Sequence, residues 1–414
     1  MKMQLDLQHY FGRMLQLALM MVLLLNACPA RAQKTKAKTV RQELSQARNY
    51  LKPRNKNYAQ AEQLMTKLLN DSANRDDIRI YAVLLDAVKG QYDQANERLY
   101  LKQKQDTAAF FNLNRRLFTI AETLDSLDMR PDEKGRVNPS HRNKNAAMLH
   151  HYRANIYSAG TFFIRKGQWN DAYNFFSTYL DCDSQPLFAS YKYAESDPRM
   201  AEAAYWAAYS GYKLNDAEKT LHYQHLARKD SVHADFLLQF TAEAYRWQKN
   251  DSAYTATLEE GFRRYPLFTY FFPRLIDDYT AKEQYDKALA LTDSALARCD
   301  TCDIFLFAKS SVLLRMERWK ESVVYSELLI HRNDSLPEPY FNAGTAFVNM
   351  AESGEAQNDK RLQRTYYQKA RTYMEYYRLL MPDEKRKWAP ALYRIYLNLN
   401  LGRQFDEIDK ILNS

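Results

Sequence analysis

Residues 269–334 read TYFFPRLIDDYTAKEQYDKALALTDSALARCDTCDIFLFAKSSVLLRMERWKESVVYSELLIHRND and contain two helical repeats set end to end. Trp319 lies 34 residues after Tyr285, and Asp251 lies 34 residues before it. The same interval separates Pro266, Asp300 and Asp334. A fixed period of this length in a glycine-poor, helix-forming sequence predicts pairs of antiparallel helices stacked into a solenoid.

Two segments resemble the tetratricopeptide repeat (TPR) family. One is Tyr285-Asp286-Lys287-Ala288, with Ile276 and Tyr279 before it and Ala295-Leu296 after it. The other is Gly160-x-x-Phe163-x-x-x-Gly167-Gln168-Trp169-Asn170-Asp171-Ala172, followed by Phe176 and Leu180. Only ten glycines and no long run of alternating β-branched residues occur, which favours an all-α chain. We predict an all-α fold, an α-α superhelix of about seven or eight antiparallel helix pairs.

The N-terminal residues indicate export. Met14 to Leu25 form an apolar run of 12 residues behind Lys2 and Arg13, which reaches only about 18 Å as a helix and is too short for a bilayer core of roughly 30 Å. This pattern predicts a secretory signal peptide, residues 1–32, cleaved after Ala32. In the alternative interpretation, Leu25-Asn26-Ala27-Cys28 resembles a bacterial lipoprotein cleavage box and Cys28 carries the lipid. Residues 33–39 are predicted to be a disordered tether.

The remaining chain divides by composition. We predict an N-terminal TPR-like helical block at 40–128 and a loop insertion at 129–145, where proline, glycine and charged residues replace apolar ones. The main TPR solenoid is expected at 146–414, with insertions near 184–199 and 352–364. The loop at 129–145 is the predicted boundary between the two blocks.

Charge points to no particular partner. The chain has 59 basic and 50 acidic residues, a formal net charge of +9. The charges are spread at helical spacing without a block of like charges, which is typical of a solvated helical surface. Export also argues against nucleic acid as a partner.

No catalytic constellation is found. Cys299 and Cys302 form a CxxC motif at the end of a repeat's second helix, without the preceding strand of a redox motif. A local disulfide or free loop cysteines are expected, with redox and metal roles as alternatives. Cys182 would remain unpaired, either as a buried thiol or in an intermolecular bond. We find no GxSxG, phosphate-binding glycine loop or HExxH, so we predict no enzymatic activity, no cofactor and no metal.

The resemblance implies that repeat positions 2, 5, 9 and 12 to 13 of each first helix line a concave groove. The aromatic and arginine residues at these positions would suit an extended peptide. The paired lysines and asparagines of the family's carboxylate clamp are missing. The predicted groove residues are Tyr157, Tyr205, Tyr209, Tyr212, Phe236, Arg246, Trp247, Tyr270, Phe307 and Arg315.

These features together predict a non-enzymatic scaffold or adaptor in the bacterial cell envelope that binds a protein or peptide. Contact with the membrane is expected only through a lipid on Cys28. The alternatives are a glycan-binding lipoprotein and an outer-membrane lipoprotein of a secretion machine. The sequence leaves the oligomeric state open.

Overall fold

The computed structural model describes residues 39–132, 134–137 and 139–413. The predicted signal peptide, Cys28 and all of the predicted tether except Thr39 lie outside these residues. The chain forms two compact units, Met1–His233 and Ala234–Ser414. The described part of each unit is helical, without any strand, and consecutive helices pack in pairs, which confirms the predicted all-α fold class.

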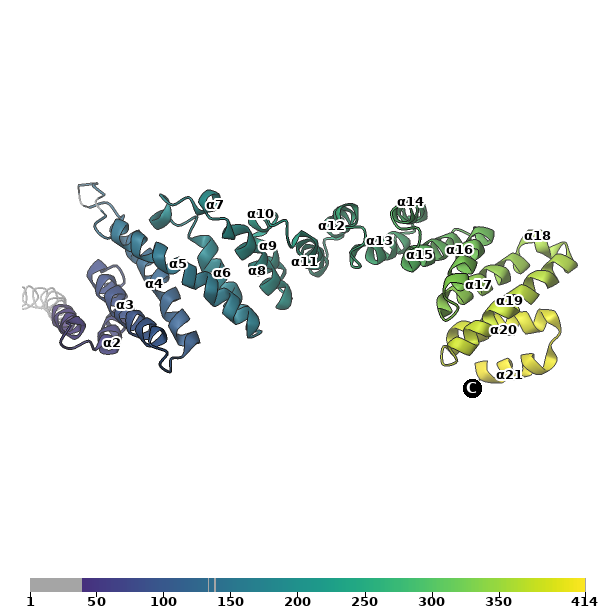
Figure 1. The fold of residues 1–414 in the computed structure, drawn as a ribbon, viewed down its shortest axis with the longest axis horizontal. Helices are drawn as coiled ribbons and strands as arrows, with labels where there is room; N and C mark the ends of the chain where they lie inside the picture. The colour runs from purple at the N-terminus through teal and green to yellow at the C-terminus, as the bar shows by residue number, and fades with distance from the viewer. Residues whose placement is uncertain (1–38, 133, 138, 414) are drawn as a thin grey trace, which may run out of the picture. The chain divides into compact units, whose positions relative to one another are not determined.

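The first unit begins with a helix at residues 39–51. Its long helices α3 to α6 lie side by side in Figure 1, and each packs against the next. The elements that follow the first helix are α2 (Tyr58–Leu69), η1 (Ser72–Asn74), α3 (Ile78–Tyr100), α4 (Thr107–Asp128), α5 (Arg142–Arg165), α6 (Trp169–Asp181), η2 (Pro186–Phe188), α7 (Tyr193–Ser196), α8 (Arg199–Lys213), α9 (Ala217–His222) and α10 (Gln224–Ala227).

In the second unit, each helix packs against its neighbour in sequence, and first helices of successive pairs also touch: α13 with α15, and α15 with α17. These three helices therefore share one face. The elements are α11 (Ala234–Trp247), α12 (Asp251–Arg264), α13 (Phe271–Ala281), α14 (Tyr285–Leu296), α15 (Asp303–Arg315), α16 (Trp319–Arg332), α17 (Pro337–Glu352), α18 (Gly354–Gln357), α19 (Lys360–Leu380), α20 (Lys385–Leu399) and α21 (Gly402–Leu412).

The 34-residue period is visible in the backbone. Asp251, Tyr285 and Trp319 are the first residues of α12, α14 and α16. Two residues before each of them the chain takes a left-handed conformation, with φ values of 55°, 56° and 59°. A residue in this conformation ends a helix and reverses the chain. The recurring left-handed residue therefore explains why the two helices of each pair are antiparallel.

Small residues allow the helices to approach closely. Ala172 in the first unit and Ala288 in the second are fully buried three residues after the start of their helices. The second helix packs there against the first. Large aromatic side chains such as Phe176 and Phe271 fill the remaining space, and burial of such rings contributes much of the packing energy.

Tyrosines also link neighbouring pairs through their hydroxyl groups. Each of these hydroxyls donates a hydrogen bond to a carboxylate on a helix of the preceding pair. In the first unit the bond is Tyr223 to Asp181 at 2.7 Å. In the second unit the bonds are Tyr270 to Glu243 at 2.8 Å, Tyr279 to Glu259 at 2.6 Å, Tyr373 to Glu327 at 2.6 Å and Tyr396 to Glu375 at 2.9 Å.

The predicted boundary at 129–145 is not where the units separate, since they divide between His233 and Ala234. The loop is also shorter than expected, because α5 begins at Arg142. Arg142 donates to buried Asp125 on α4 at 2.7 and 2.6 Å. This ion pair holds α4 and α5 together across the loop, so the loop does not divide the core.

Both predicted insertions contain short helical elements. The segment near 184–199 holds η2 and α7, and it buries Phe188 and Tyr193. The segment near 352–364 holds α18, and α19 already begins at Lys360. The Asp359 carboxylate accepts hydrogen bonds from the first turn of α19 at 2.9 and 3.0 Å, which fixes this early start.

Candidate functional site

Four predicted groove residues lie in the first unit, Tyr157 on α5 and three tyrosines on α8. Tyr205 is only 5% exposed, and its ring stacks on His233 with 4.3 Å between ring centres. Packing therefore covers most of the Tyr205 ring, and its contact with a partner stays a prediction.

Tyr157, Tyr209 and Tyr212 are half-buried. The Tyr157 ring packs edge-on against Phe176 at 5.7 Å, and that of Tyr209 packs edge-on against Trp169 at 5.6 Å. Burial and a hydrogen bond to a glutamate raise the pKa of Tyr157 well above its ordinary value. These tyrosines fill space between helices, and their contact with a partner stays a prediction.

In the second unit, buried Glu243 on α11 organises two further predicted residues. The Tyr270 hydroxyl donates to Glu243 at 2.8 Å, and Arg246 Nε donates to it at 2.8 Å. Arg274 lies over the Tyr270 ring at 3.9 Å. Tyr270 is 6% exposed, and burial, with the bond to Glu243, raises its pKa. Tyr270 is therefore largely covered, whereas Arg246 is exposed, and contact of either residue with a partner stays a prediction.

Phe236 is exposed and Trp247 is half-buried, both on α11. Phe236 packs edge-on against Phe268 at 5.2 Å. Neither lines the hollows described below. Two of the ten predicted residues, Phe307 and Arg315, line one of these hollows together.

That hollow lies between α13 and α15 and has a volume of about 250 Å³. Apolar side chains form most of its wall, and Thr280, Ser311, Asp277 and Arg315 supply polar groups. The apolar lining consists of Phe272, Pro273, Ile276, Ile304, Phe307, Ala308 and Val312.

A second hollow of about 320 Å³ lies on the other side of α15, against α16 and α17. It is lined by Asp303, Ile304, Phe307, Leu329, Leu336, Glu338 and Pro339. Ile304 and Phe307 belong to both hollows and form a ridge between them. Ile304 is 49% exposed. We call the two hollows together with this ridge the α15 groove.

The polar groups of the α15 groove differ in their partners. Asp303 is paired with Arg332, whose Nε lies 3.1 Å from the carboxylate. Ser311 accepts a hydrogen bond from Asn342 at 3.0 Å. In the described part of the chain, no ion pair involves Glu338, Asp277 or Arg315. These three exposed charges are available to a ligand.

Sequence reasoning missed part of this site, although its own rule could have found it. Counted from Asp303, the first residue of α15, positions 2, 5, 9 and 13 are Ile304, Phe307, Ser311 and Arg315. All four line the first hollow. Selecting only aromatic and arginine residues left out Ile304 and Ser311. Leu336 and Pro339 are contributed by the next pair, and no position in the rule marks them.

The CxxC motif adjoins the α15 groove. Cys299 and Cys302 form a disulfide with 5.5 Å between their Cα atoms, and Cys302 directly precedes α15. Arg332 donates to the carbonyl oxygen of Thr301, in the same loop, at 2.7 Å. The start of α15 is therefore fixed by one covalent and one polar link. Cys182 is a fully buried free thiol, so the folded chain does not present it for an intermolecular bond.

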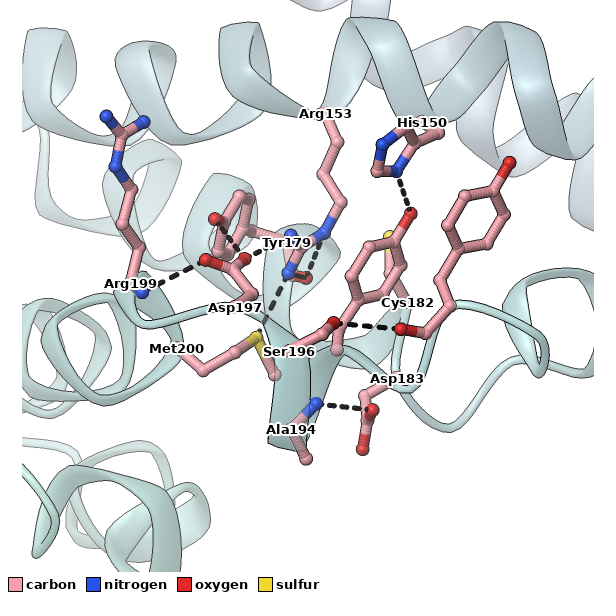
Figure 2. A network of polar contacts seen from close by, with 12 residues as sticks. His150, Arg153, Tyr179, Cys182, Asp183, Ala194, Ser196, Asp197, Arg199 and Met200 are labelled. Atoms are coloured by element: carbon pink, nitrogen blue, oxygen red, sulfur yellow. Dashed lines mark hydrogen bonds and ion pairs between the residues drawn. The ribbon is translucent and has the colours of Figure 1, made fainter.

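The first unit has a hollow of a different kind, with a volume of about 350 Å³, beside the insertion at 184–199. Its floor is the buried guanidinium of Arg153, which forms an ion pair with Asp197. The guanidinium lies between the rings of Tyr179 and Tyr193, at 3.6 and 3.8 Å from their centres. Figure 2 shows Arg153 and Tyr179 converging on Asp197.

The polar groups of this hollow largely satisfy one another. Arg153 donates to the Tyr179 carbonyl oxygen at 3.3 and 3.0 Å, and the Tyr179 hydroxyl donates to Asp197 at 2.5 Å. Burial tends to raise the pKa of Asp197, but hydrogen bonds from Tyr179, Arg153 and Arg199 outweigh it and hold the pKa below its ordinary value. The cluster therefore anchors the insertion to α5 and α6.

Two further searches cover only residues 39–132, 134–137 and 139–413. Among them, no three or more His, Cys, Asp or Glu side chains are grouped so that they could hold a metal ion. None of the helices in these ranges has both the length and the apolar character required to cross a membrane.

Comparisons with known proteins give a likeness of structure only. No protein-family model and no curated protein sequence matches the chain. The TPR domain of P58(IPK) has a TM-score of 0.25 at 10% identity, over 89% of this chain and 98% of that one. Yeast Tom70 has 0.30 at 12% identity, over 90% of each chain. The Cut9–Hcn1 hetero-tetramer of APC/C has 0.25 at 10% identity, over 87% of this chain and 84% of that one. Values this low support no inference about partners.

Proposed function

We propose that this chain is a non-enzymatic protein-binding scaffold and that the α15 groove holds a segment of its partner. The observation that carries the proposal is the ridge of Ile304 and Phe307 between two apolar hollows. Leaving large apolar side chains in water is unfavourable, by about 25 cal/mol for each Å². Ile304 is 49% exposed and Phe307 is half-buried, so a partner segment that covers the ridge would remove this apolar surface from water.

The size of the hollows favours part of a protein over a small molecule. Sites for small molecules typically have volumes of about 300–1,000 Å³ and enclose most of the ligand. The two hollows are about 250 and 320 Å³ and open to solvent. Each suits a single large side chain of a partner that continues beyond it.

Site-specific photo-cross-linking in growing cells tests the proposal. A benzophenone amino acid placed at Ile304 is expected to give discrete adducts with one or a few proteins. The matched control places it at Val324 on α16, which is also β-branched and is 61% exposed but lies outside the groove. The captured protein is then purified and its affinity for the unlabelled chain is measured.

The expected affinity loss for Ile304→Asp is at least about tenfold, since loss of a central hot-spot contact costs about 2 kcal/mol or more and tenfold corresponds to about 1.4 kcal/mol. Val324→Asp should leave the affinity unchanged. Equal adducts from positions 304 and 324, or equal loss of affinity in both variants, would contradict binding in the groove.

We also propose that the chain works outside the cytoplasm, in the cell envelope. The apolar run of residues 14–25 and the Cys299–Cys302 disulfide support this, because disulfides persist in oxidising compartments. Cell fractionation tests the location, and incorporation of labelled palmitate, abolished by Cys28→Ser, tests lipidation. Recovery of the intact chain in the cytoplasm would overturn this part of the proposal.

A further inference from the structure

The arrangement of the two hollows limits the conformation of a bound segment. They lie on opposite sides of the Ile304–Phe307 ridge, one toward α13 and the other toward α17. A helix with its side chains is about 10–12 Å across. If two side chains of a bound segment enter the two hollows, the backbone of that segment must pass over α15. An extended backbone is narrow enough to cross α15 with side chains in both hollows. A helical segment would rest on the Ile304–Phe307 ridge and would not place its side chains in both.

The same geometry limits the spacing of the two entering side chains. A polyproline II segment rises about 3.1 Å per residue and repeats its direction every three residues. A β-strand rises about 3.3 Å per residue and returns to the same face at every second residue. To span roughly 10–12 Å with both side chains on the groove side, the residues must be about three positions apart in the first conformation and about four in the second.

Charge distinguishes the two ends of the groove. The hollow toward α17 has Glu338, which is exposed and lies in the first turn of its helix. The hollow toward α13 has Asp277 and Arg315, whose opposite charges offset each other. Although Glu338 interacts favourably with the positive end of α17, that interaction is weak at an exposed site and is screened by salt. Its carboxylate therefore remains able to pair with a cation.

We propose that the α15 groove recognises an extended peptide with two large apolar side chains three or four positions apart and a lysine or arginine at the α17 end, beside Glu338. This inference rests on the proposed function and adds the sequence class of the partner segment. The chain has a net charge of +9, yet we expect it to select a basic residue. The nearby Glu338 carboxylate, and not the overall charge of the chain, sets the charge preference of the groove.

The test uses the full chain and fluorescein-labelled synthetic peptides in a polarisation assay. Each peptide has two leucines separated by up to about five serines, with either a lysine or a glutamate next to one leucine. The tightest binding is expected with two or three serines between the leucines. The lysine peptide should bind about tenfold more tightly than its glutamate counterpart, as expected for one well-placed charge contact.

Two charge variants sharpen the result. Glu338→Lys should reverse the preference for lysine over glutamate. Glu355→Lys is the matched control, because Glu355 is also an exposed glutamate in the first turn of a helix, α18, but lies outside the groove. It should keep the preference unchanged. Phe307→Ala should weaken all peptides, because it removes the ridge that both hollows share.

The outcomes separate this inference from the proposed function. Affinity independent of leucine spacing, or an unchanged lysine preference in Glu338→Lys, overturns the inference. If the spacing or charge test fails but a benzophenone at position 304 cross-links to a partner in cells, the proposed protein-binding function stands without this inference. Failure of every peptide to bind, together with equal cross-linking at positions 304 and 324, removes both.

Discussion

The hollow above Arg153 in the first unit is similar in volume to each of the two hollows of the α15 groove in the second, but it is opposite in chemistry. In the first, a buried guanidinium, a carboxylate and two tyrosine rings satisfy one another. In the second, Ile304 is exposed and Phe307 is half-buried, and both line apolar hollows. A concentration of aromatic and charged residues can therefore be satisfied within the fold. Our proposal places partner binding where an apolar side chain is left exposed instead.

Arg153→Met gives the largest expected effect, because it removes a buried guanidinium and leaves the carboxylate of Asp197, whose side chain is 15% exposed, without its ion-pair partner. Breaking a buried pair in this way costs about 3–5 kcal/mol. Hydrogen exchange measured by mass spectrometry should show faster exchange in α5, α6 and α8 of the variant.

The control is Arg246→Met in the second unit. The side chain of Arg246 is 59% exposed against 6% for Arg153. Its partner Glu243 is buried, but it keeps the bond from Tyr270 and a second arginine, Arg274, whose Nε lies 3.8 Å from the carboxylate. We expect a cost below about 1 kcal/mol there. Similar losses in both variants would mean that the two arginines play the same role and would end the contrast drawn above.

A pH-dependent effect of intermediate size is expected from Glu122 on α4. Burial, with a contribution from nearby Asp181, raises the pKa of Glu122 from 4.5 to about 7. Since the folded chain then holds a proton that the unfolded chain releases, the free energy of unfolding falls as pH rises from about 4.5 to about 7. The loss is about 2–3 kcal/mol and stays constant at higher pH.

Urea denaturation of the wild type and of Glu122→Gln between about pH 4 and pH 8 measures this effect. The variant should gain stability relative to the wild type as pH rises through this range. A stability difference that does not change with pH would show that Glu122 titrates in the folded chain as it does in the unfolded one.

The smallest effect compares two glycines on first helices, Gly211 on α8 and Gly344 on α17. A Cβ at Gly211 would lie 2.5 Å from the backbone nitrogen of Thr220, whereas at Gly344 it would lie 2.9 Å from the terminal methyl of Met374. The backbone cannot yield, but the flexible Met374 side chain can.

Gly211→Ala should therefore destabilise its unit by about 1–2 kcal/mol, even after the gain in helix propensity. Gly344→Ala should be close to neutral. Thermal denaturation of the two variants provides the comparison. A larger loss for Gly344→Ala would show that Met374 is held as firmly as the backbone.

The fold could be predicted from the sequence because each repeat carries its own local signals. Asp251, Tyr285 and Trp319 each begin a helix at the 34-residue spacing, and Trp169 begins one within the motif that resembles the repeat family. The left-handed turns were not predictable in the same way, since Lys249, Glu283 and Glu317 occupy them instead of glycine. The residue types at these positions do not indicate a left-handed conformation, so the conformation must depend on the surrounding structure.

The site was less predictable, because burial depends on residues far apart in the chain. Tyr270 and Phe307 satisfy the same positional rule. Tyr270 is buried and its hydroxyl donates to Glu243, whereas the Phe307 side chain lines the α15 groove. Leu336 enters the second hollow only because α17 packs beside α15. The pattern within one repeat carries no information about such neighbours.

The tyrosine–carboxylate bonds between pairs have a practical consequence for dissecting the molecule. A shortened chain that ends after α16 would lose Tyr373 and leave Glu327 without its donor, and one that begins directly after α12 would deprive Tyr270 and Tyr279 of their acceptors. Repeats of this protein are therefore poor modules for transplantation or stepwise deletion. A fragment designed to retain the α15 groove should keep both helix pairs that flank it and replace each orphaned partner with an apolar residue of similar shape.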